Sequence, residues 1–273
     1  MAVMNTSTLL LYDFPGSICS QMARLALAEK GIAYNRRIVD IMDAAEQFEP
    51  WYTALNPRAV VPTLKIDDEV VTDTIRIVQR IDSDCDGPPL TPDDEAGAEA
   101  MERMMRDIMA LHYGVLLYSR RLEADGSAPT VAARGRFLRE QLERYPERAE
   151  LLERRIAGNE NLLKILADPA ETARHVDEAK ALVGRFEETL SEHQFVSGGQ
   201  YTLADAFATA ALARFRLHGF DTWWTGGGNS HVADYYGRMK ARPSWQAASV
   251  TRPWPARRAL DRLTRRRRAT PRI

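Results

Sequence analysis

A short apolar run that leads directly into a helix start is the feature that most constrains this chain. Residues Leu9 to Tyr12 are apolar and few enough for a buried strand. The stretch Phe14 to Gln21 follows, and an amphipathic pattern predicts a helix over residues 18–29, which ends at a glycine, Gly31. The stretch therefore places its polar side chains at a helix N-terminus, beside free backbone N–H groups and the positive end of the helix dipole.

Ser17 and Cys19 occupy this helix start. Such a setting lowers the pKa of a thiol, so the position predicts a reactive thiolate at Cys19. Two plainer interpretations remain open at this point: Ser17 as an ordinary N-cap, and Cys19 as a small buried apolar side chain. No second cysteine stands at C-x-x-C spacing, which excludes a dithiol oxidoreductase.

The next residues continue an alternation of strands and helices. We expect a second strand over residues 34–41 and a β-hairpin over 63–72, with its turn at 67–68. Asp73 then caps a helix. This order predicts an α/β layer with a mixed sheet.

Pro62 stands where the hairpin begins, a position that tolerates a missing N–H. A trans bond before it is the general expectation. If the bond is cis, the Val61 backbone is turned outward and can pair with an extended peptide.

A stretch rich in Gly, Pro and Asp divides the chain into parts of different composition. We expect a first domain over residues 1–84, a linker over 85–93, an all-helical domain over 94–250 and an arginine-rich tail over 251–273.

Within the helical part, one helix is expected over residues 98–121, a loop over 122–132 and a charged helical region over 134–166, interrupted near Pro146 and Gly158. The Glu and Arg clusters of that region predict solvated faces with i,i+4 pairs. Thr202 and Asp205 form a capping box before a nearly all-apolar helix, which should be central to the domain.

Composition excludes several classes of protein. The net charge of -1 carries no polyanion-binding signature, so no nucleic-acid partner is expected. No apolar run approaches the roughly 20 residues of a spanning helix, and there is no secretory signal. Two cysteines, Cys19 and Cys85, suit a reducing compartment, so we expect the cytoplasm. No His/Cys spacing suits a metal.

The arginine-rich tail predicts a solvated segment, with contact to RNA or anionic lipid as the alternative.

Four motifs together resemble the cytosolic glutathione transferase superfamily, over roughly residues 9–249: Ser17-Ile18-Cys19-Ser20, Val61-Pro62-Thr63-Leu64, Asp73-Thr74-Ile75 and Tyr201-Thr202-Leu203-Ala204-Asp205. Within the superfamily the chain looks most like the tetrachlorohydroquinone and chlorohydroquinone reductive dehalogenases. The resemblance implies a thioredoxin-like domain, then an all-helical domain, with glutathione between them. It also implies a cis bond before Pro62 and a homodimer.

The same resemblance implies how glutathione is held. The Val61 N–H and C=O, next to Pro62, would pair with the cysteinyl backbone as an added strand. Thr74 would hold the γ-glutamyl carboxylate and Asp73 the ammonium group. Gln47 is a candidate for the glycine carboxylate.

The implied chemistry uses Ser17 and Cys19. Ser17 would donate a hydrogen bond to the glutathione sulfur and favour the thiolate. Glutathione thiolate would add to a quinone-like tautomer of a halogenated ring, and halide would leave. Cys19 would then attack the glutathionyl sulfur, releasing the reduced product, and a second glutathione would resolve the mixed disulfide. Candidates for lining the pocket of this hydrophobic electrophile are Phe14, His112 and Tyr113.

Two other functions remain open. One is ordinary glutathione conjugation or ether cleavage that uses Ser17 alone. The other is a non-catalytic, glutathione-transferase-like binding or scaffold protein, which the arginine-rich tail and the charged helical region would suit.

Overall fold

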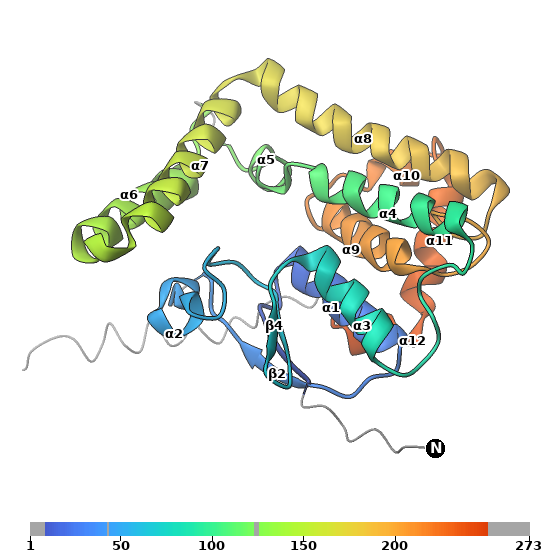
Figure 1. The fold of residues 1–273 in the computed structure, drawn as a ribbon. Helices are drawn as coiled ribbons and strands as arrows, with labels where there is room; N and C mark the ends of the chain where they lie inside the picture. The colour runs from blue at the N-terminus through green and yellow to red at the C-terminus, as the bar shows by residue number, and fades with distance from the viewer. Residues whose placement is uncertain (1–8, 43, 123–125, 251–273) are drawn as a thin grey trace, which may run out of the picture.

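The computed structural model describes residues 9–42, 44–122 and 126–250. A four-stranded sheet flanked by helices is followed by a domain made of helices (Figure 1). This confirms the predicted fold class, a thioredoxin-like domain followed by an all-helical domain. The arginine-rich tail lies outside the described residues.

The sheet has the strand order β2-β1-β3-β4. Its strands are β1 (Leu9–Asp13), β2 (Asn35–Ile38), β3 (Thr63–Ile66) and β4 (Glu69–Val71). β1 pairs parallel with β2 and antiparallel with β3, which pairs antiparallel with β4. The sheet is therefore mixed, as the order of strands and helices predicted.

The two faces of the sheet are covered by different elements because successive side chains of a strand point to opposite sides. Leu9 and Leu11 of β1 belong to the main core, with α1 (Ile18–Glu29) and α3 (Thr74–Asp84). Tyr12 faces a smaller cluster that includes Tyr52 and Val61. That second face is covered by η1 (Glu46–Phe48) and α2 (Pro50–Thr53).

The helical domain is built around α9 (Leu203–Leu217), whose residues 203–213 are all buried. The predicted capping box is present: Thr202 Oγ1 accepts from the Ala204 N–H, and Asp205 Oδ2 accepts from the Thr202 N–H. The other helices are α4 (Glu95–Ala110), α5 (Tyr113–Tyr118), α6 (Pro129–Arg144), η2 (Pro146–Arg148), α7 (Ala149–Ala167), α8 (Pro169–Glu192), α10 (Thr222–Thr225), α11 (Ser230–Ala241) and α12 (Pro243–Ala247).

Several predicted boundaries were wrong. The helix expected over residues 98–121 is two helices, α4 and α5, and α6 begins at Pro129 inside the expected loop. The predicted break at Pro146 is present, since the residue before a proline is disfavoured in helical conformation. The break near Gly158 is absent, because one glycine costs only about 1 kcal/mol and packing along α7 offsets it.

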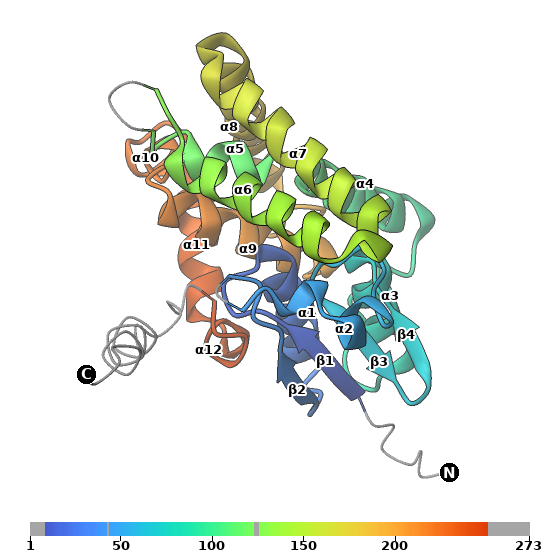
Figure 2. The same ribbon diagram turned by 90° about the vertical axis from the view of Figure 1, so that its left-hand side faces the viewer.

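Helices α6 and α7 form a hairpin that leaves the helical bundle and reaches over the α/β domain (Figures 1 and 2). A small cluster joins the two parts, with Phe48 and Ala59 on one side and Leu138 and Leu152 on the other. Arg148 Nη1 of this hairpin donates to the Phe48 carbonyl at 2.6 Å. The hairpin is therefore a roof above the loops that follow β2 and precede β3.

A second contact between the domains lies behind α1, where α9 and α12 pack against it. Arg24 of α1 is almost completely buried, and its Nε donates to the Ala248 carbonyl at 2.8 Å. Arg214 of α9 donates to the Gly16 carbonyl at 2.5 Å. The turn that carries Ser17 is thus fixed from the helical domain. No helix within the described ranges is long and apolar enough to cross a membrane.

Candidate active site between the two domains

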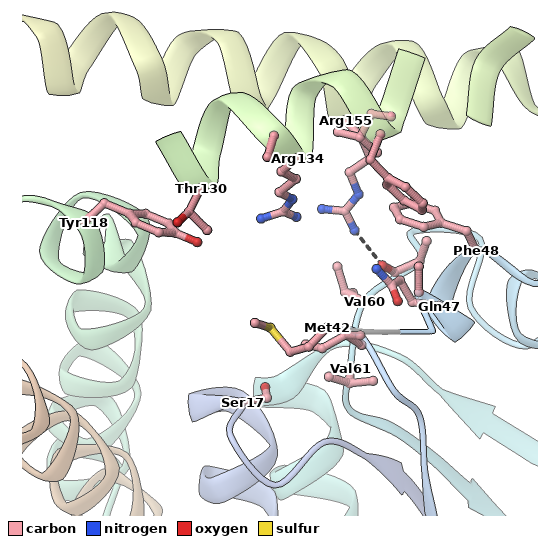
Figure 3. A pocket seen from close by; sticks show the side chains of 16 residues that line it. Ser17, Met42, Gln47, Phe48, Val60, Val61, Tyr118, Thr130, Arg134 and Arg155 are labelled. Atoms are coloured by element: carbon pink, nitrogen blue, oxygen red, sulfur yellow. Dashed lines mark hydrogen bonds between the residues drawn. The ribbon is translucent and has the colours of Figure 1, made fainter. Parts of the chain in front are cut away.

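A pocket of about 450 Å³ lies between the roof and the α/β domain (Figure 3). Its floor holds three of the residues predicted for the site, Ser17, Gln47 and Val61. The rest of that side is formed by Ile41, Met42, Ala45, Phe48, Ala59 and Val60. Residues of α5, α6 and α7 face it: Tyr118, Thr130, Ala133, Arg134, Phe137, Leu138 and Arg155. The volume falls within the range of about 300–1,000 Å³ that is usual for small-molecule sites.

Ser17 is the N-cap of α1. Its Oγ accepts a hydrogen bond from the Ser20 N–H at 3.3 Å, so the N-cap interpretation is confirmed. Because the Ser17 oxygen accepts in this bond, its hydrogen remains available to donate. Ser17 lines the pocket, so the same hydroxyl can cap the helix and donate to a ligand.

The Val61–Pro62 peptide bond is cis, as the family resemblance implied. Val61 precedes β3, which begins at Thr63, and it lies beyond the pairing of Tyr12 with Thr63. Its N–H and C=O make no hydrogen bond with any described residue. The pocket therefore contains an unpaired strand edge, to which an extended peptide backbone can add.

Gln47 lies in η1 and is 7% exposed. Its Oε1 is buried and has no hydrogen-bond partner among the described residues. Buried polar atoms in native proteins are almost always paired, by protein, water or ligand. An unpaired amide oxygen at the wall of the pocket therefore indicates a hydrogen-bond donor there, from a polar ligand or from water.

Asp73 and Thr74 form the start of α3. Asp73 is its N-cap and accepts from the Ile75 and Arg76 N–H groups, at 3.0 and 3.2 Å. The predicted cap is confirmed. Its other carboxylate oxygen lies 3.6 Å from Nη2 of Arg58. The first helical residue, Thr74, is buried.

Cys19 does not line the pocket, and its side chain is only partly exposed. Burial raises the pKa of the Cys19 thiol; a hydrogen bond from Thr74 and the charge of Arg214 act in the opposite direction but are smaller. The predicted lowering of this pKa was wrong, because removing the thiolate from water outweighs the favourable helix start. The thiol still lies one residue from Ile18 at the head of α1, next to Thr74.

The three predicted acceptor residues have other surroundings. Phe14 belongs to the buried cluster that includes Tyr52 and Val61 and does not line the pocket. Tyr113 stacks on Phe215 and donates to the Ile108 carbonyl at 3.0 Å, so it is mainly structural. His112 caps α5 through Nδ1 and lines a neighbouring pocket.

The sequence analysis missed two arginines that project into the pocket. Arg134 and Arg155 point from the roof toward the floor (Figure 3). Arg155 donates to the carbonyls of Arg58 and Ala59, at 2.5 and 2.7 Å.

A signal for both arginines was present in the sequence. Arg134 has only apolar or hydroxyl residues three and four positions away, including Val131 and Leu138, and Arg155 is spaced likewise among Leu151, Leu152, Gly158 and Asn159. Side chains at these spacings share a helix face. An arginine without acidic neighbours on an apolar face is directed toward another part of the protein rather than into a solvated ion-pair network.

No group of three or more His, Cys, Asp or Glu side chains in the described part of the chain is arranged to hold a metal ion.

Comparisons with known proteins agree with this geometry. Residues 16–84 match the model of the glutathione S-transferase N-terminal domain, and residues 169–238 match that of the C-terminal domain. Tetrachloro-p-hydroquinone reductive dehalogenase of Sphingobium chlorophenolicum is 32% identical over 247 residues, which cover 89% of this chain and 96% of that protein. Glutathione S-transferase TCHQD of Arabidopsis thaliana is 25% identical, with 86% and 87% of the two chains covered.

Among solved structures, the fold is similar to β-etherase LigF from Sphingobium sp. strain SYK-6. The TM-score is 0.66 at 22% identity, over 88% of this chain and 98% of that one. A theta-class glutathione S-transferase from Xanthomonas axonopodis pv. citri, solved with glutathione bound, gives a TM-score of 0.64 at 19% identity, over 90% and 99% of the two chains. The domain matches and the full-length relative show that the chain belongs to the glutathione S-transferase family.

Proposed function

We propose that the chain is a glutathione-dependent enzyme that acts on an electrophilic, aromatic small molecule. The observation that carries this proposal is the unpaired backbone of Val61, which shares one pocket with Ser17 and the orphaned amide oxygen of Gln47. A tripeptide thiol offers a backbone that can pair with Val61 and a sulfur that can accept from Ser17. Its amide N–H groups, or a water held on its glycine carboxylate, can donate to Gln47.

The chemistry of the residues present supports this pose, with Val61 lining the pocket and Asp73 and Thr74 outside its lining. The Val61 N–H and C=O would pair with the cysteinyl backbone, with Pro62 fixing the chain direction. The N-terminus of α3 at Thr74 favours the γ-glutamyl carboxylate, and the Asp73 carboxylate favours the ammonium group. Glutathione supplies a nucleophilic thiol, and the Ser17 hydroxyl, by donating to its sulfur, would stabilise the anion.

Two chemistries follow from this pose. In the reductive one, which the 32% identical dehalogenase supports, Cys19 takes over the glutathionyl group from the substrate. A sulfur–sulfur bond forms, the carbon–sulfur bond breaks, and its electron pair and a proton go to the reduced ring. A second glutathione then releases Cys19 and leaves as the disulfide, so that glutathione is the reductant throughout.

The second chemistry is conjugation or ether cleavage with Ser17 alone. It is favoured by one observation: burial raises the pKa of Cys19, whereas Ser17 already lines the pocket. Ser17→Ala should lower turnover about 100-fold in both cases, because one donor to a developing anion is lost. Cys19→Ser separates the two, since it abolishes only the reductive reaction.

The tests use binding, mass and turnover. Calorimetric titration of the full chain with glutathione should show binding. Incubation with oxidised glutathione should add one glutathionyl group to the wild type and none to Cys19→Ser. Absence of glutathione binding contradicts the proposal and favours the binding or scaffold protein instead. Binding without turnover across halogenated hydroquinones and chlorodinitrobenzene would show a non-catalytic relative.

Two further parts of the proposal concern the cell and the assembly. The two unpaired cysteines suit a reducing compartment, so we place the protein in the cytoplasm. A homodimer is proposed from the family alone, and light scattering of the full chain tests it.

A further inference from the structure

A second pocket of about 460 Å³ adjoins the first, and the two share Val60, Arg134 and Arg155. Four arginines line it: Arg58 from the loop before β3, Arg134 from α6, and Arg154 and Arg155 from α7. We call these four residues the arginine cluster. Neither pocket has an Asp or Glu among the described residues that line it. Three separate segments of the chain therefore converge on one space with charges of one sign.

The charges of the arginine cluster are poorly compensated. Arg58 has the cluster's one ion pair within the described ranges, a 3.6 Å contact with Asp73 in which both side chains are largely exposed. Arg155 donates to backbone carbonyls, and the structure gives Arg134 and Arg154 no hydrogen bond or ion pair with a described residue. Burial, and then the three neighbouring arginines, lower the pKa of Arg155 to about 10.

Two arginines of the helical domain outside the cluster are paired with carboxylates. On α6, Arg139 lies 2.7 Å from Glu160 of α7, and on α8 Arg174 forms ion pairs with Glu171 and Glu178. Arg134 and Arg154 have no such partner among the described residues, so the pocket keeps an excess of positive charge. A cleft lined by one sign of charge concentrates ligands of the opposite sign.

The shape of the connected pockets indicates what kind of anion fits. The first pocket, which Ser17 lines, has many apolar wall residues, among them Met42 and Phe137, and suits an aromatic ring. Arg134 of the arginine cluster points from the roof into the first pocket (Figure 3) and also lines the second. The guanidinium group is planar and donates two parallel hydrogen bonds, which match a carboxylate and also bind an ionised phenol.

We infer that the arginine cluster binds an anionic group, a carboxylate or an ionised phenol, on the aromatic acceptor. The acceptor ring lies toward Ser17 and its anionic group lies between α6, α7 and the loop at Arg58. That the bound aromatic compound is the acceptor of a reaction rests on the proposed function, whereas binding of an anion does not require turnover. The enzyme therefore selects acidic aromatic electrophiles rather than neutral ones.

The test measures binding without reaction. Unreactive probes are titrated into the full chain at pH 7.5: 3,5-dinitrobenzoate and 2,4-dinitrophenolate as anions, and 1,3-dinitrobenzene as the neutral analogue. The wild type should bind at least one anion about tenfold or more tightly than the neutral probe, which is the effect of one or two charge-assisted hydrogen bonds. The two anions distinguish carboxylate from phenolate recognition. Salt at 0.5 M should reduce the preference.

The double variant Arg134→Gln/Arg154→Gln should lose that preference and keep its affinity for the neutral probe. Both side chains are exposed, so the fold should be retained. Arg136→Gln is the matched control, because Arg136 is an exposed arginine of α6 that lines neither pocket, and it should bind like the wild type. Arg155 is avoided because its bonds to the loop hold the roof in place.

Three results would overturn the inference: equal affinity of the wild type for anions and the neutral probe, an unchanged preference in the double variant, or an equal loss in Arg136→Gln. A separate titration with glutathione excludes the remaining assignment. If the double variant loses glutathione affinity instead of anion affinity, the arginine cluster serves the carboxylates of glutathione and the inference is wrong. Failure of the proposed function shows differently, as absence of glutathione binding in the wild type.

Discussion

The helical domain touches the α/β domain in two places that are built differently. Behind α1, the contact belongs to the main core, and the buried side chains of α9 and the Arg24–Ala248 bond hold it. At the roof, a small cluster of four buried apolar side chains, with partly buried ones packed against them, and arginine-to-carbonyl bonds form the contact within the described residues. The first place holds Ser17 through the Gly16 carbonyl, and the second carries the arginine cluster.

The difference separates two tasks. The residues proposed to activate the thiol stand on the rigid contact, where a shift of the Ser17 turn would disturb a large core. The residues inferred to select the acceptor stand on a contact with little buried apolar surface, which can change at small cost in stability. We therefore expect damage behind α1 to unfold the protein and damage at the roof to remain local.

The largest effect is expected from Asp205→Ala, at the start of α9. Asp205 accepts hydrogen bonds from the Val196 N–H, the Thr202 N–H and the Tyr235 hydroxyl, at 3.1, 2.8 and 2.8 Å. Removing the acceptor leaves three buried donors unpaired and should lower the free energy of unfolding by about 4 kcal/mol. Urea denaturation measures this. A loss below about 1 kcal/mol would contradict the view that α9, which makes the contact behind α1, is essential to the fold.

The same carboxylate should give the next largest effect, as a pH dependence. Burial raises the pKa of Asp205 to about 6, from a usual 3.8, although four hydrogen bonds act against this. The folded state then holds the proton of Asp205 more tightly than the unfolded state. The contribution of this group to the free energy of unfolding is therefore largest below about pH 4 and falls, by up to about 3 kcal/mol, as the pH rises through 6. Asp205→Asn does not titrate, so the wild type minus this variant, measured from pH 4 to 7, isolates the effect. A flat difference would contradict it.

Leu152→Ala tests the roof. Leu152 is 1% exposed and belongs to the cluster with Phe48 and Leu138. The lost packing should cost about 2 kcal/mol, and it should appear as faster hydrogen exchange in α6 and α7 while α9 stays protected. Equal loss of protection in α9 would show that the two contacts are one cooperative unit and that the comparison fails.

The smallest effect is expected from Arg154→Gln. It removes one of four like charges and should raise the melting temperature slightly, by a stabilisation of a few tenths of a kcal/mol at low salt. The gain should vanish in 0.5 M salt and be absent in Arg136→Gln. A lower melting temperature at low salt would mean that Arg154 has a stabilising partner.

The sequence predicted the α/β half of the molecule well, because its signals are local. The spacing of apolar residues gave the exact bounds of α1, and Asp73 and Thr202 marked the starts of α3 and α9. It predicted the roof poorly. The charge pattern of residues 134–166 indicated solvated faces. Arg134 and Arg155 instead face the other domain, and Arg155 bonds to the Ala59 carbonyl, 96 positions earlier in the chain. No local sequence pattern encodes such a contact.

The predicted lowering of the Cys19 pKa was wrong for a related reason. A helix start is visible in the sequence, and it favours the thiolate. Folding then buries the thiol near Thr74 and Arg214. This burial raises the pKa of Cys19 by more than those two residues lower it. A local feature was therefore read correctly while the solvent exposure that decides its effect was not.

The bonds of Arg155 to the carbonyls of Arg58 and Ala59 affect any attempt to change substrate range by grafting. Those carbonyls belong to the chain segment that continues into Val60 and Val61. A transplanted hairpin with a different residue at position 155 would therefore release the loop proposed to bind the tripeptide. A chimera should therefore exchange the hairpin and the segment at 58–61 together. Otherwise the proposed affinity for the thiol and the inferred selectivity for the electrophile should both change.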